Sequence, residues 1–270
     1  MKVMLDHGIR THASCFDWAD QPLRNPFDGS YYDDRFIKGV VRHPQVSEPL
    51  QSNRDAIYTV ARLIREGRLT ALSYIELISE SMKDYLGGKP LDALRSCNIQ
   101  HAHSPINRSN FFDSGFDGFV RKGGKKDKKM GNLGGSQVEF LEWLVSLDAQ
   151  AVESIIQTYG GKRLTEFEVE SFRKLEWFKE FVERFRTSEN YPDAFHIWAT
   201  ERNRIDCFLT LDFKIINTCK QIKKEKNGPQ LNALVLSPLE LLAELEVDAV
   251  DEIPYEFDRF YTIAEVPNLM

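Results

Sequence analysis

The sequence predicts an α/β protein: a three-layer α/β/α arrangement around a parallel sheet, interrupted by an inserted subdomain of helices and loops. Three observations support this prediction. Short apolar runs alternate with amphipathic helical patterns toward both ends of the 270-residue chain. These runs are nearly continuous, which is typical of parallel strands that are covered on both faces. Between the two ends, the alternation gives way to a glycine-rich, basic stretch followed by helical patterns.

The first elements are a strand, an irregular segment and a helix. The strand is "KVMLD", Lys2 to Asp6. Residues 17–50 are rich in Pro, Asp and Gly and have only a weak period, so we interpret them as irregular. The stretch "SNRDAIYTVARLIREG" has its apolar residues on one helical face, and Gly67 ends the helix.

A second strand and helix follow, and then the regular pattern stops. The strand is predicted at 69–72, and Ser73 and Glu76 have the spacing of a capping box at the start of the next helix. From Gly87 to about Gly135 no period is visible, as in long loops that are functional or disordered.

Three helices are predicted after this loop. They cover 136–147, 149–159 and 165–187, and the last of these is a single long amphipathic helix. Strands and helices then alternate again through "YPDAFHIWATERNRIDCFLTLDFKIIN" and "NALVLSPLELLAELEV". The predicted domains are a discontinuous α/β domain, an insertion and a C-terminal tail, covering 1–85 with 160–250, 86–159 and 251–270.

Composition excludes several classes of protein. The chain is 42% hydrophobic and 28% charged, which is ordinary for a globular protein. No apolar run approaches membrane-spanning length, and the N-terminus is too polar for a signal peptide, so no membrane partner is expected. The four cysteines are scattered and form no CxxC motif, which favours a reduced, cytoplasmic protein. The net charge of −6 argues against broad, nonspecific binding of nucleic acid.

Four acidic residues are expected near the carboxyl ends of strands, where parallel α/β sheets bind ligands. Asp6 ends the first strand, Glu76 lies in the helical turn after the second, and Asp193 and Asp212 flank "DCFLT". Crowded carboxylates repel one another, and a hard divalent cation relieves that repulsion. Each acid also has a structural interpretation as a helix-start charge, a capping residue or a turn residue.

The order of these acids resembles that of the PIN domain family. The strongest part is "DAFHIWATERNRIDCFLTLD", and "VLSPLELLAEL" is similar to the last strand and helix of the family. The resemblance covers 1–8, 52–82 and 166–245, and implies a PIN-like fold with a large insertion. It also implies that the chain is a Mg²⁺- or Mn²⁺-dependent nuclease. By residue-wise transfer the metal ligands would be Asp6, Glu76, Asp193 and Asp212, with Thr210 assisting.

Other candidate residues have weaker signals. Six cations in "RKGGKKDKK" form the main basic patch; they are Arg121, Lys122, Lys125, Lys126, Lys128 and Lys129. They are interpreted either as a solvated loop or as a flap that contacts a nucleic-acid backbone. His196 is interpreted as a core histidine in preference to a group that orients a ligand. Cys97, His101 and His103 form an incomplete zinc motif, so a loop is favoured there.

The expected function is hydrolysis of phosphodiester bonds, with RNA as the favoured substrate, by an endoribonuclease. A toxin neutralised by a small antitoxin partner is a subcase, and a homo-oligomer stays open. The alternative is a catalytically weak or inactive nucleic-acid-binding or regulatory protein. His7 and Gly8 support this alternative, because the family usually has a small polar residue and then Asn or Ser after the first aspartate.

Overall fold

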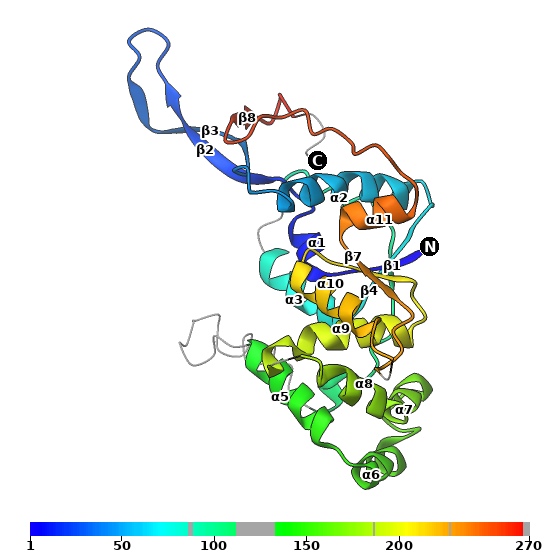
Figure 1. Ribbon diagram of the computed structural model, residues 1–270. Helices are drawn as coiled ribbons and strands as arrows, with labels where there is room; N and C mark the ends of the chain where they lie inside the picture. Colours follow the sequence, from blue (N-terminus) through cyan, green and yellow to red (C-terminus); the bar gives the residue numbers. More distant parts are fainter. Residues whose placement is uncertain (86–88, 112–132, 186, 227, 267–270) are drawn as a thin grey trace. The chain divides into compact units, whose positions relative to one another are not determined.

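The computed structural model describes residues 1–85, 89–111, 133–185, 187–226 and 228–266 (Figure 1). It has a mixed α/β fold in which a five-stranded parallel sheet, in the order β5-β4-β1-β6-β7, is flanked by helices. This confirms the predicted fold class at that level. The chain divides into two compact units: unit 1 is 1–100, 209–213 and 236–270, and unit 2 is 101–208 and 214–235. The predicted domain boundaries stay a prediction.

Buried aliphatic residues build the strands of the parallel sheet. The strands are β1 (Lys2–Leu5), β4 (Thr70–Ser73), β5 (Ile99–His101), β6 (Cys207–Leu209) and β7 (Leu234–Leu236). β1 pairs with β4 in parallel, with Val3 opposite Ala71. Both of these residues are fully buried, as the continuous apolar runs predicted. The carboxyl ends of β1, β6 and β7 are joined by two backbone hydrogen bonds of 3.0 Å, from Asp6 N to Leu209 O and from Thr210 N to Leu236 O.

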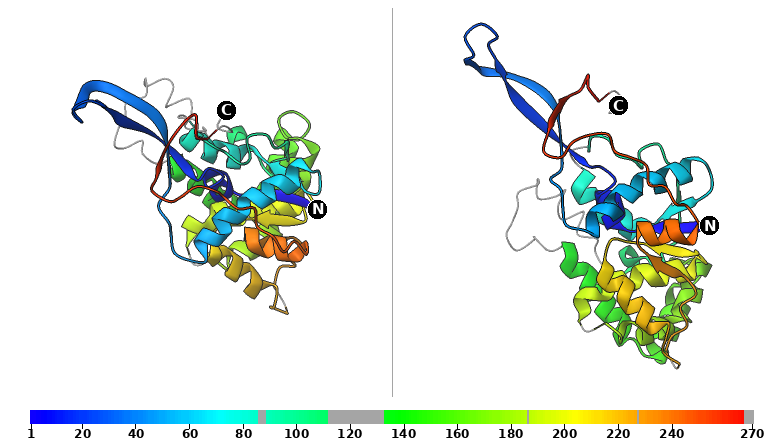
Figure 2. Two further views of the ribbon diagram at one scale, coloured as in Figure 1. Left: turned by 90° about the horizontal axis from the view of Figure 1, so that it is seen from above. Right: turned by 45° about the horizontal axis from the view of Figure 1, so that its top comes forward.

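Among the described residues of unit 1, four helices each follow or precede a strand of the sheet. They are α1 (His7–Thr11), α2 (Leu50–Arg65), α3 (Ile75–Tyr85) and α11 (Pro238–Glu244). α2 and α11 lie side by side in Figures 1 and 2, and Leu239 N donates to Asn53 Oδ1 across them at 3.0 Å. Ser237 and Glu240 form the full capping box at the start of α11. The predicted start of that helix is therefore confirmed.

The prediction of a capping box by Ser73 and Glu76 is wrong. Ser73 is the last residue of β4, and α3 begins at Ile75. Tyr74 occupies the N-cap position, since its carbonyl oxygen already accepts a hydrogen bond of 3.0 Å from Ile78 N. The sequence spacing was right for a capping box, but the helix starts one residue later than that spacing requires.

The prediction that 17–50 is irregular is wrong. This segment contains most of a long antiparallel ribbon of β2 (Phe16–Arg24) and β3 (Tyr31–Arg42), and β8 (Phe260–Thr262) pairs with the inner end of β3 (Figure 1). Most of the ribbon is exposed, so its sequence carries no alternation of buried and exposed residues. At its inner end, Phe16, Val40 and Tyr261 are buried and form a small separate core.

Unit 2 is helical, with aromatic side chains in its core. The described helices of this unit are η1 (Arg108–Asn110), α5 (Leu133–Ser146), α6 (Ala149–Tyr159), α7 (Glu166–Phe172), α8 (Leu175–Val182), η2 (Ser188–Asn190), α9 (Tyr191–Arg202) and α10 (Phe213–Ile222). The first residue of α10 still belongs to unit 1. Phe178 of α8 stacks on Trp198 of α9, with ring centroids 4.9 Å apart. Phe140 of α5 packs edge-on against Phe195 of α9.

The prediction of one helix over 165–187 is also wrong, because α7 and α8 are separate. α7 ends at Phe172, and Lys174 N donates to Ser171 O in a tight turn before Leu175. The buried residues on both sides of the turn keep a helical spacing, so periodicity alone does not detect the break. Across the residues that the structure describes, no helix has both the length and the apolar character needed to cross a bilayer.

Candidate active site

Three of the four predicted acids follow the carboxyl ends of neighbouring strands. Asp6 directly follows β1, Asp212 is three residues beyond the end of β6, and Glu76 is three residues beyond the end of β4. Because β4, β1 and β6 are adjacent in the parallel sheet, these acids belong to one edge of it. This is the edge at which open α/β sheets bind ligands.

Thr210 links Asp6 to the loop that carries Asp212. Its side chain is fully buried, and its hydroxyl donates to Asp6 Oδ2 at 2.6 Å. The same hydroxyl oxygen accepts a hydrogen bond of 3.0 Å from the backbone N of Asp212. The other carboxylate oxygen of Asp6 accepts from His7 N at 2.7 Å and so caps the start of α1. The carboxylate of Asp6 is therefore held in position by the ends of two strands.

Glu76 and Asp212 differ in their surroundings. Glu76 is buried in the first turn of α3, with 6% of its surface exposed. Asp212 is exposed and immediately precedes the first residue of α10. A buried carboxylate needs partners or a cation, whereas an exposed one is available to a ligand that approaches from solvent.

Asp193 belongs to unit 2 and lies in the first turn of α9. It is half-buried, and every residue from Ala194 to Thr200 is buried. His196 is 1% exposed and its ring stacks on Phe208 with centroids 6.4 Å apart. The interpretation of His196 as a core histidine is therefore confirmed.

Within the described ranges, no group of three or more His, Cys, Asp or Glu side chains gathers closely enough to hold a metal ion. The donor chemistry at the sheet edge still suits a hard cation, since carboxylate and hydroxyl oxygens are the ligands that Mg²⁺ prefers. His7 lies beside this edge, with its ring nitrogens 3.4 Å from Ser81 Oγ and 3.3 Å from Thr11 Oγ1.

The predicted nucleic-acid-binding run lies outside the described residues. It comprises Arg121, Lys122, Lys125, Lys126, Lys128 and Lys129. At the incomplete zinc motif, Cys97 Sγ lies within reach of the backbone oxygens of Ala61 and Ala93. His103 packs against Phe167, with ring centroids 5.2 Å apart.

A cluster of basic side chains in unit 1 was not found from the sequence. His12, Arg42, His43 and Arg54 line one small hollow. They come from the end of α1, the end of β3 and the second turn of α2, so they are too far apart in the chain to form a motif. The sequence predicted residues 17–50 to be irregular. Without the β2–β3 ribbon in that prediction, there was no reason to expect Arg42 close to His12.

Unit 2 has a larger hollow of its own, with a volume of about 900 Å³. It is lined by aromatic and charged side chains, among them Phe167, Trp177 and Arg202. The guanidinium of Arg202 lies over the ring of Phe167 at 5.4 Å and its Nε donates to Ser171 Oγ at 3.1 Å. The hollow has acidic and basic side chains in equal number, Glu166, Glu170 and Glu201 against Lys174, Arg202 and Arg204, so its charge does not favour one class of ligand.

The fold and the strand ends therefore define an α/β protein with an acidic edge on its parallel sheet. Comparisons of the chain with protein-family models, with curated proteins and with solved structures find no match.

Proposed function

We propose that this protein is a PIN-like, metal-dependent nuclease that hydrolyses phosphodiester bonds, with RNA as the favoured substrate. The observation that carries the proposal is the set of acids at adjacent strand ends, together with the hydroxyl of Thr210 between Asp6 and the Asp212 loop. Acids in this order along the chain also carry the resemblance to the PIN domain family. The three-layer PIN-like arrangement with an insertion at 86–159 is part of the same proposal.

In this proposal Asp6, Asp212 and Glu76 hold Mg²⁺ or Mn²⁺, and the resemblance to the PIN domain family implies Asp193 as a fourth ligand. A divalent ion bound by carboxylates activates water and neutralises charge on a phosphodiester. Thr210 fixes the orientation of the Asp6 carboxylate by donating to Oδ2, as hydrogen bonds to the ligands of a metal site commonly do. The basic run 121–129 supplies contacts to the phosphate backbone, which give affinity without sequence preference.

Nuclease assays on single-stranded RNA, with and without EDTA, test this proposal. The parent should cleave in Mg²⁺ or Mn²⁺ and lose activity in EDTA. Asp6→Asn should lower the rate by about a hundredfold or more, since it removes a charge at the centre of the site. Asp206→Asn is the matched control, because Asp206 is an exposed aspartate at the amino end of β6. Equal activity in Asp6→Asn and the parent would refute the proposal.

A second function is favoured by one observation: His7 and Gly8 follow the first aspartate, where the PIN domain family usually has a small polar residue and then Asn or Ser. This departure agrees with a nucleic-acid-binding or regulatory protein of the same fold that has little catalytic activity. RNA binding that persists in EDTA, without cleavage under any metal condition, would support this alternative. An antitoxin partner belongs only to the first proposal and requires a toxic nuclease activity.

A further inference from the structure

The small basic hollow of unit 1 has a free volume of about 10 Å³, which is the space of roughly one water molecule. Its lining includes His12, Arg42, His43 and Arg54. Three of these side chains have a buried nitrogen with no hydrogen-bond partner among the described residues: Nε of Arg42, Nε of Arg54 and Nε2 of His43. Such groups are rare in folded proteins, and each needs an explanation.

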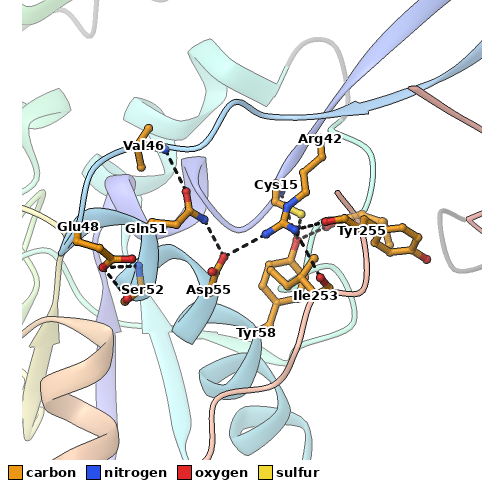
Figure 3. Close-up of polar contacts among 11 residues, drawn as sticks. Cys15, Arg42, Val46, Glu48, Gln51, Ser52, Asp55, Tyr58, Ile253 and Tyr255 are labelled. Atoms are coloured by element: carbon orange, nitrogen blue, oxygen red, sulfur yellow. Dashed lines mark hydrogen bonds and ion pairs between the residues drawn. The ribbon is translucent and has the colours of Figure 1, made fainter. Parts of the chain in front are cut away.

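Contacts of its two Nη atoms hold the Arg42 side chain in place. Nη1 donates to the backbone oxygens of Tyr255 and Ile253, and Nη2 lies 3.7 Å from the carboxylate of Asp55 (Figure 3). The guanidinium also lies over the ring of Phe257 at 3.9 Å. Because every other part of this group is held, Nε–H cannot reach another acceptor without breaking these contacts. Arg42 therefore provides a rigid, buried donor.

Arg54 provides the second donor. Its Nε is buried without a partner, and its Nη2 lies 3.5 Å from His12 Nε2. Arginine has only donors, so His12 Nε2 must act as the acceptor, and the ring of His12 is then neutral. His43 Nε2 lies 3.0 Å from Asp17 Oδ2, close enough for an ion pair but without hydrogen-bond geometry. The two arginine Nε groups are therefore the donors that have no acceptor nearby among the described residues.

Two unpartnered guanidinium donors beside a space for one atom favour an anionic oxygen. A neutral water could accept from both donors, but only an anionic oxygen would also offset the charge of the two guanidinium groups. Arginine Nε and Nη donors match phosphate oxygens in charge and geometry. We propose that this hollow binds one oxygen of a phosphoryl group, between Nε of Arg42 and Nε of Arg54.

The surrounding charges agree with an anion site. The pKa of His12 is lowered from 6.5 to about 4, first by burial and then by its basic neighbours Arg54, Lys89, His43 and His7. These basic neighbours come from α2, the segment after α3, the end of β3 and α1. A phosphoryl oxygen in the hollow would offset this excess of positive charge.

The source of the phosphoryl group rests on the proposed function. His12 is the C-cap of α1, and Asp6 is its N-cap, so the two residues are about 9 Å apart along the helix axis at about 1.5 Å per residue. A phosphate in the hollow is thus close to the acidic sheet edge but separate from it. In a nucleic acid it would belong to a nucleotide near the scissile bond.

Two measurements test the site and its source. First, the parent's melting temperature is measured in inorganic phosphate and in chloride of equal ionic strength. Phosphate should raise the melting temperature of the parent but not that of Arg54→Met. Second, binding of a single-stranded RNA oligonucleotide is measured in EDTA, so that neither metal nor cleavage is needed. Arg54→Met should weaken binding on the order of tenfold and reduce the salt slope by about 0.7.

Arg65→Met is the matched control, since Arg65 lies on the same helix and is exposed. Arg65→Met should still melt at a higher temperature in phosphate than in chloride, and it should keep most of its affinity for RNA. If phosphate stabilises the parent but Arg54→Met and Arg65→Met bind RNA equally well, the hollow is an anion site whose ligand is free phosphate and not the RNA backbone. No phosphate effect on the parent, with equal RNA binding in both variants, would overturn the inference. Because these tests need no cleavage, their outcome is separate from that of the nuclease assay.

Discussion

At the residue scale, Thr210 is the side chain that organises the acidic edge of the sheet. It donates to Asp6 and accepts from the backbone of Asp212, and it is fully buried. Thr210→Val keeps the shape but leaves both partners without their hydrogen bond. We expect the free energy of unfolding to fall by about 2 kcal/mol, within the range for a lost hydrogen bond to a charged group.

Thr210→Ser is the control for this prediction, because it keeps the hydroxyl and loses only a methyl group. Its cost should be about 1 kcal/mol, and it should keep the affinity of the protein for Mn²⁺. Urea denaturation of the three proteins provides the comparison. A smaller loss of stability in Thr210→Val than in Thr210→Ser would show that the hydroxyl does not hold the site together.

His12 gives the structure a pH dependence whose sign follows from its surroundings. Its pKa is about 4 in the folded protein, because of burial first and of neighbouring cations second. The unfolded chain has the ordinary value of 6.5, so it binds more protons between these two values. The contribution of His12 to stability is therefore complete above pH 6.5 and is lost as the pH falls toward 4.

We expect His12→Gln to flatten this part of the stability curve. The midpoints of urea unfolding at about pH 7, 5.5 and 4.5, which span the two pKa values, are compared for the parent and the variant. The parent should lose more stability than His12→Gln over this range. An identical decrease in both proteins would mean that His12 is protonated in the folded state as easily as in the unfolded chain.

The candidate site was predictable from the sequence only in part. Asp6 and Asp212 follow strands whose apolar runs are visible, so their place at one sheet edge could be predicted. The hydrogen bond from Thr210 to Asp6 joins residues 204 positions apart, and no local pattern carries it. Arg42 and Arg54 were missed for the same reason, since each is an ordinary arginine until the ribbon and α2 are placed.

At the element scale, the ribbon of β2 and β3 depends on a glycine at its inner end. A Cβ at Gly39 would lie 2.3 Å from Tyr261 O and 2.5 Å from Phe260 Cζ. This close approach lets β8 pair with β3 at Gly39, Val40 and Val41. Gly39 lies in a segment that the sequence predicted to be irregular, and the structure shows it inside β3, where the neighbouring backbone requires a glycine.

Gly39→Ala should therefore displace β8. The expected loss in the free energy of unfolding is about 2 kcal/mol, as for other insertions into a well-packed place. Hydrogen exchange is the most direct readout. The amide of Val40 lies on the same side of β3 as Arg42, whose carbonyl accepts from Asp258 N, so it faces β8 and should exchange faster. The amides of Gln21 and Ile37 in the outer ribbon should not change. Unchanged exchange at Val40 would show that β8 can shift without losing its pairing.

Helix ends were predicted well where a capping residue marks them. The capping box of Ser237 and Glu240 is plain in the sequence, and α11 begins there. The start of α3 was placed one residue too early, and the turn at Arg173 and Lys174 was missed. In both cases the apolar period continues across the boundary, so periodicity alone cannot locate it.

At the scale of the whole molecule, the parallel sheet is the feature that brings distant acids to one edge. β1, β4 and β6 come from three separate parts of the chain, and their carboxyl ends are adjacent because the strands are parallel. This arrangement is what an α/β sequence pattern predicts. The helical unit 2 has no such regular order of elements, so its core of stacked aromatic rings could not be predicted from the sequence.

The central claim is that the acids at this edge bind a divalent cation. Thermal melting with and without Mn²⁺, on the parent, Asp212→Asn and the control Asp206→Asn, tests it most directly. Binding to the folded state stabilises by about 2.7 kcal/mol when Mn²⁺ is at a hundred times its dissociation constant. We expect Mn²⁺ to raise the melting temperature of the parent and of Asp206→Asn, and to have little effect on Asp212→Asn. A shift in none of the proteins, or an equal shift in all three, would contradict the account.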